Sequence, residues 1–100
     1  MTVLRRSKAD LVWRSGDVPR RAKAAELVVG DGRALVRSGE DVVELDELGM
    51  ALWPLLDGLR SAPTLARVLA EQRGEPSLAT AVAVRTVLEE LAAAGAITWV

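Results

Sequence analysis

The sequence contains no cysteine and no histidine. Without cysteine the chain has no disulfide, no thiol nucleophile and no thiolate metal ligand. Without histidine it also lacks the commonest general base and the commonest metal ligand. Its carboxylates fall at expected strand edges, at a helix start and on a helix face, and no glycine-rich phosphate loop precedes a helix. We therefore predict a protein that is not an enzyme and that uses no cofactor or metal.

Aromatic residues are scarce, with three tryptophans and neither phenylalanine nor tyrosine among the 100 residues. Since half of the residues are hydrophobic, the chain can still build one modest core from leucine, valine and alanine. No run of about 18 apolar residues is present to span a bilayer, and the N-terminus is too charged for a signal peptide. We expect a cytoplasmic protein that makes no membrane contact.

The near-zero net charge of −1 conceals an uneven distribution. Residues 1–23 carry seven basic and two acidic side chains, a net of +5, whereas residues 24–100 carry six basic and twelve acidic ones, a net of −6. This pattern predicts a basic N-terminal arm, 1–23, and a folded domain, 24–100. Such an arm can bind nucleic acid, bind an acidic partner or fold back on its own domain. Within it, residues 10–14 have the pattern of a strand, and Gly16-Asp17 with Pro19 marks a turn.

Three short segments have strand patterns and are separated by glycine-containing turns, which favours an antiparallel meander. A fourth apolar segment near the C-terminus predicts a closing strand. These segments are 25–29, 33–37, 41–45 and 96–99, with turns at 30–32 and 38–40.

Three helices follow the third strand. Asp46 is a good N-cap for a helix over about 47–57. Pro54 inside it predicts either a kink at Trp53–Pro54, which we favour, or a second short turn that begins at the proline. Ser61 caps a second helix, about 62–73, and a third covers about 78–94. The fold class is therefore α+β: a three-stranded antiparallel sheet followed by three helices, with the proportions of a winged helix-turn-helix.

The stretch ELDELGMALWPLLDG at 44–58, with VRTVLEELAAAGAI at 84–97, resembles the PqqD-like proteins. The resemblance covers about residues 24–99 and implies a RiPP recognition element. Such a module binds the leader segment of a ribosomally made precursor peptide. It presents that peptide to a modifying enzyme, such as a radical SAM maturase, a cyclodehydratase or a leader protease, and is not itself an enzyme.

A peptide site is predicted between the third strand and the last helix. An unpaired edge of that strand can hydrogen-bond an extended peptide by strand addition. On the helix, an apolar and charged stripe lies away from the core-facing residues Ala81, Val84, Val87, Leu88 and Leu91. The predicted peptide-binding residues are Val42, Val43, Glu44, Leu78, Val82, Arg85 and Glu89.

Three alternatives remain open: cover of the stripe by the arm, cover by a second copy of the chain, and DNA binding. The arm or a second copy in a homodimer can cover the stripe, which would give a structural or dimerisation module without a peptide ligand. DNA binding, natural for a helix-turn-helix, is disfavoured because residues 75–94 carry Arg85 alone against three glutamates.

Overall fold

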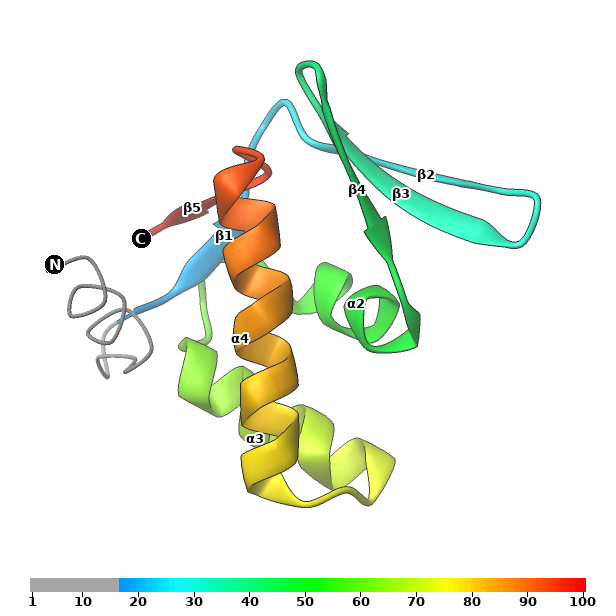
Figure 1. Ribbon diagram of the computed structural model, residues 1–100. Helices are drawn as coiled ribbons and strands as arrows, with labels where there is room; N and C mark the ends of the chain where they lie inside the picture. Colours follow the sequence, from blue (N-terminus) through cyan, green and yellow to red (C-terminus); the bar gives the residue numbers. More distant parts are fainter. Residues whose placement is uncertain (1–16) are drawn as a thin grey trace, which may run out of the picture.

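The computed structural model describes residues 17–100, which form two small antiparallel sheets on either side of a long C-terminal helix (Figure 1). The elements in chain order are β1 (Pro19–Arg21), β2 (Glu26–Gly30), β3 (Arg33–Ser38), β4 (Asp41–Leu45), α2 (Glu47–Leu52), the 3₁₀ turn η1 (Trp53–Leu55), α3 (Ala62–Arg73), α4 (Ser77–Ala93) and β5 (Ile97–Trp99). No helix within residues 17–100 is long and apolar enough to cross a membrane.

The meander predicted from the sequence is confirmed as a three-stranded sheet in the order β2-β3-β4. Two-residue turns connect its strands. Asp31 and Gly32 both adopt positive φ, 53° and 73°, as a type I′ turn requires, and Gly39 alone does so in the second turn, at 62°. Because both loops are this short, the pairing register is fixed along the whole sheet.

The first helix begins as predicted, with the carboxylate of Asp46 accepting a hydrogen bond of 2.8 Å from the Gly49 amide. The predicted kink is wrong, because the α-helix ends at Leu52 and a 3₁₀ turn follows. Pro54 has no amide hydrogen for an i→i−4 bond, and its ring clashes with the preceding turn, so the chain tightens there instead of bending. The short turn places the Trp53 side chain in the hydrophobic core.

The two later helices follow their sequence signals closely. Ser61 accepts a hydrogen bond of 3.3 Å from the Thr64 amide at the start of α3, and Gly74 ends that helix with φ 64°. Helix α4 begins at Ser77, one residue earlier than expected. The two helices pack against each other and contribute much of the core.

Part of the basic arm is built into the domain. β1 pairs antiparallel with the closing strand β5, and on its other side Arg20 forms a bridge with Asp57. Of the turn expected over Gly16-Asp17 and Pro19, Gly16 lies outside the described residues. The assignment of Pro19 to this turn is wrong, because Pro19 begins a strand and is buried. The arm therefore folds back on the domain over residues 17–23, whereas the strand predicted at 10–14 lies outside the described residues.

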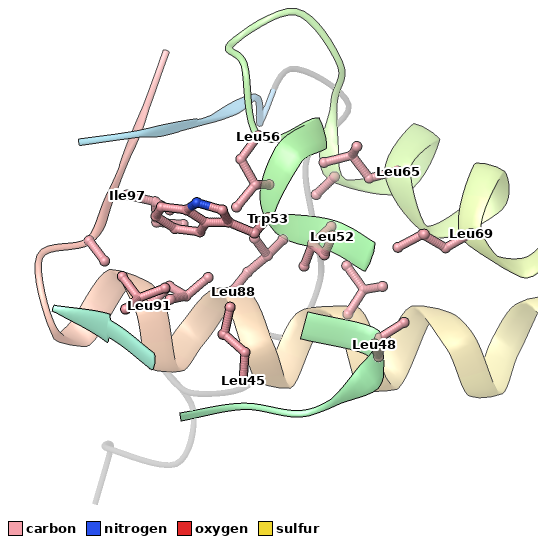
Figure 2. Close-up of a cluster of buried hydrophobic side chains, with 14 of the residues drawn as sticks. Leu45, Leu48, Leu52, Trp53, Leu56, Leu65, Leu69, Leu88, Leu91 and Ile97 are labelled. Carbon is pink, nitrogen blue, oxygen red and sulfur yellow. The ribbon is translucent and has the colours of Figure 1, made fainter. Parts of the chain in front are cut away.

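One core joins the sheet to the helices. The Trp53 side chain, only 7% exposed, lies beside Leu88 and Leu91 of α4 and Ile97 of β5 (Figure 2). Of the predicted core face of α4, Val84, Leu88 and Leu91 are buried, and Ala81 and Val87 are partly buried against the core. The other fully buried large side chains include Leu52, Leu56, Leu65 and Leu69.

Glycine at position 49 has a specific packing role. A Cβ atom there would lie 3.1 Å from both Cβ and Cδ2 of Leu45. This is tighter than ordinary carbon–carbon contact, so a side chain would push α2 away from the end of β4. Gly49 thus keeps the strand-to-helix junction compact although glycine lowers helix stability.

Candidate functional site

Strand β4 has one unpaired edge within the described part of the chain. It pairs with β3 through the register from Ala34↔Leu45 to Ser38↔Asp41, and neither β1 nor β5 reaches it. In a two-residue hairpin the residue pair next to the loop is hydrogen-bonded, and pairs then alternate along the ladder. The main-chain N–H and C=O groups of Val42 and Glu44 therefore point away from β3, toward the open edge.

A groove of about 500 Å³ lies between this strand and α4. One wall is formed by the end of β4 and the beginning of α2, and the other by one face of α4. The lining residues are Glu44, Leu45, Asp46, Leu48, Ala83, Thr86, Val87 and Glu90. The groove is thus lined by aliphatic side chains and one threonine, and all of its charged side chains are carboxylates.

Two of the three carboxylates are engaged by the fold. Glu44 accepts two hydrogen bonds from the Arg33 guanidinium, at 3.0 and 3.1 Å, and this pairing lowers the pKa of the Glu44 carboxyl. Asp46 caps α2, as described above. For Glu90 no side-chain hydrogen bond or ion pair is found with any residue from 17 to 100.

The groove-lining face of α4 differs from the stripe predicted from the sequence. At about 100° per residue, the lining residues and the stripe lie about 120° apart around the helix axis. The arc of about 120° between them is the solvent-facing side of α4, and the core-facing residues lie on the opposite side, so the two sets occupy opposite flanks of the core face. Among the residues of the stripe, Leu78 is 78% exposed and Val82 is 44% exposed.

The structure therefore brings part of the predicted site together. Glu44 lines the groove, while its neighbours Val42, which is exposed, and Val43, which is half-buried, belong to the same strand. The stripe of Leu78, Val82, Arg85 and Glu89 does not line it, and its role remains a prediction. Sequence reasoning missed Ala83, Thr86 and Glu90 and assigned Val87 to the core. Their signal was a small-and-polar flank on an otherwise apolar helix.

Within residues 17–100 no group of three or more histidine, cysteine, aspartate or glutamate side chains is placed to hold a metal ion.

The order of elements defines an α+β domain of the RiPP-recognition-element type. The structure is similar to the solution NMR structure of the PqqD truncation of Methylobacterium extorquens PqqCD, described as a functional and stand-alone RiPP recognition element. The TM-score is 0.71 at 19% sequence identity, and the match covers 89% of this chain and 97% of that chain. The likeness shows a shared fold.

The chain belongs to the PqqD family, since the profile of "Coenzyme PQQ synthesis protein D (PqqD)" matches residues 32–97, more than half of its length. No curated protein is matched by the sequence. RiPP recognition elements are generally non-catalytic peptide-binding domains, so membership implies recognition of a precursor peptide.

Proposed function

We propose that this protein binds the leader segment of a ribosomally synthesised precursor peptide by strand addition to β4. It acts as a non-catalytic adaptor that presents the peptide to a modifying enzyme such as a radical SAM maturase, a cyclodehydratase or a leader protease. The observation that carries the proposal is the edge of β4 that no strand within residues 17–100 pairs with, beside a groove of about 500 Å³. Family membership supports the same class of ligand.

Strand addition uses groups that the fold leaves available. An extended leader would hydrogen-bond to the outward N–H and C=O groups of Val42 and Glu44. Paired residues in adjacent strands direct their side chains to the same face. Leader side chains opposite Val43 and Leu45 would therefore point into the groove, toward α4. Main-chain bonding provides affinity, and the groove provides selectivity; we expect a Kd in the micromolar to submicromolar range, on the order of −8 to −10 kcal/mol.

The proposed peptide-binding residues are Val42, Val43 and Glu44 on the strand together with Ala83, Thr86, Val87 and Glu90 on the helix. The stripe of Leu78, Val82, Arg85 and Glu89 is an alternative contact face on the other flank of α4, and a variant described below tests it.

Val42→Pro tests the binding mode. Proline removes the outward-pointing amide hydrogen, which β3 does not use, so the hairpin should persist while strand addition fails. Val29→Pro is the matched control: Val29 is also exposed, and by the same alternation its amide points outward at the opposite edge of the sheet, on β2. The probe is a synthetic leader peptide from a short open reading frame beside the gene, titrated by calorimetry.

We expect Val42→Pro to weaken binding at least tenfold, about 1.4 kcal/mol, and Val29→Pro to leave it within a factor of two. Unchanged affinity in Val42→Pro would show that the leader does not use β4. A second copy of the chain could also pair with this edge. In that case sedimentation would show a dimer that Val42→Pro converts to monomer, and the dimerisation alternative would replace the adaptor.

A further inference from the structure

The groove has a polarity that bears on which peptides it accepts. Its aliphatic lining comes from Leu45, Leu48, Ala83 and Val87, and every charged residue in it is acidic. The Thr86 hydroxyl is engaged, since it donates to the main-chain oxygen of Val82 at 3.1 Å. Of the acidic groups, Glu90 is the one without a side-chain partner in the described part of the chain. An incoming segment therefore meets an apolar surface and the negative charge of Glu90, which no side chain of residues 17–100 compensates.

The position of Glu90 along the groove follows from the direction of β4. Ser38 is opposite Asp41 in the sheet, and its hydroxyl donates to the main-chain oxygen of Gly95 at 3.1 Å. The beginning of β4 is thus level with the C-terminal end of α4, and the strand runs back toward the middle of that helix. Val43 accordingly lies nearer the level of Glu90, and Leu45 nearer that of Ala83.

In a peptide strand added to β4, alternate side chains would face α4, one at the height of Glu90 and the next at the height of Ala83. Side chains on one face of a strand recur every second residue, about 7 Å apart. The ligand residue opposite Val43 therefore approaches Glu90, whereas the ligand residue opposite Leu45 approaches the aliphatic surface of Ala83 and Val87. The first position favours a cation and the second an apolar side chain.

We propose that the β4–α4 groove selects an extended segment in which a lysine or arginine lies two residues from an aliphatic side chain, with Glu90 pairing the cation. The inference rests on the proposed function, since it specifies the ligand of the same groove. It places the specificity-determining charge on α4, while β4 supplies main-chain bonds that do not depend on the ligand sequence.

The experiment uses the full chain and a displayed library of random dodecapeptides. Peptides are selected on the wild-type protein and on Glu90→Gln. One selected peptide, and its counterpart with the basic residue changed to glutamate, are then titrated against both proteins. Glu71→Gln is the matched control, because it removes the same charge from an exposed site on α3, away from the groove. Thermal denaturation checks that each variant is folded.

We expect selection to enrich a basic residue two positions from an aliphatic one on the wild-type protein. Changing that residue to glutamate should weaken binding about tenfold for the wild-type and Glu71→Gln proteins, and less than about threefold for Glu90→Gln. Selected peptides can also be added to the protein in an NMR titration. If they shift the amide resonances of Val42 and Glu44 but show no enrichment of basic residues, the inference is overturned and the proposed function stands. A basic preference that persists in Glu90→Gln would also overturn it. If no peptide is enriched, the groove is not a peptide site and both proposals fail.

Discussion

The guanidinium of Arg21 donates a hydrogen bond of 2.9 Å to the main-chain oxygen of Trp53 and lies 6.0 Å from the centre of its indole ring. The contact joins β1, near the N-terminal end of the described chain, to the end of the first helix. Here a residue of the basic arm has a structural role, since it supports the aromatic side chain around which the core is built.

Arg21→Met should lower the free energy of unfolding by about 1.5–3 kcal/mol, because a hydrogen bond from a charged donor is lost together with the cation–π contact. Methionine preserves much of the aliphatic packing of the side chain. Lys23→Met, at an exposed position with no side-chain partner within residues 17–100, is the control and should change stability by less than about 0.5 kcal/mol. Urea denaturation measures both, and equal effects would contradict a specific role for Arg21.

Trp53→Ala should lower the free energy of unfolding by about 3–5 kcal/mol. It removes the largest buried side chain of residues 17–100 and leaves a cavity. Trp99→Ala serves as the comparison, since Trp99 is 47% exposed on β5 and should cost less than half as much. The measurement is the denaturation midpoint at constant slope. A loss below about 1 kcal/mol for Trp53→Ala would mean that the core does not depend on this residue.

The boundary predicted at residue 23 can be tested by two deletions. Removing residues 1–23 abolishes the pairing of β1 with β5 and the main-chain hydrogen bonds between β1 and residues 56–58. Each lost hydrogen bond should lower the free energy of unfolding by about 1 kcal/mol. Removing residues 1–16 leaves these bonds intact. We expect the longer deletion to lower the melting temperature strongly, and by more than the shorter one. Equal melting temperatures would show that the domain begins at residue 24.

Ala83→Glu and Val82→Glu distinguish the two flanks of α4. Ala83 lines the groove, so a glutamate there should fill it and weaken leader binding at least tenfold, about 1.4 kcal/mol. Val82 belongs to the stripe predicted from the sequence, and a loss in Val82→Glu alone would identify that stripe as the binding face. Calorimetric titration with one leader peptide provides the comparison, and circular dichroism checks helix content.

Glu44 should remain ionised to a lower pH than an unperturbed glutamate, whose pKa is about 4.3. Its folded-state pKa is lowered by the hydrogen bonds from Arg33. The stability contributed by this pair is therefore complete above the unfolded-state pKa and is lost as the pH falls through the lower folded-state value. In Arg33→Gln the NMR titration midpoint of Glu44 should rise. An unchanged midpoint would contradict a persistent ion pair.

The sequence by itself determined the elements whose signals are local. Caps such as Asp46 and Ser61 satisfy amides within the next turn, and glycines at 32, 39 and 74 adopt the positive φ that their turns require. Such signals act between residues close in the chain, so strand order, helix boundaries and family resemblance follow from them. The exception was Pro54, whose exclusion from a helix interior is equally local but leaves a choice between a kink and a tighter turn.

Only the tertiary structure decided which surface became the groove. Helical periodicity separates the core face of α4 from its two flanks, but it does not state on which flank the sheet lies. That depends on how β4 enters α2 across the close contact of Gly49 with Leu45, and on β1 pairing with β5 so that the edge of β4 stays unpaired within the described residues. The pairing of β1 with β5 joins segments distant in sequence. No periodic pattern within one segment encodes that pairing or the path of the chain from β4 into α2.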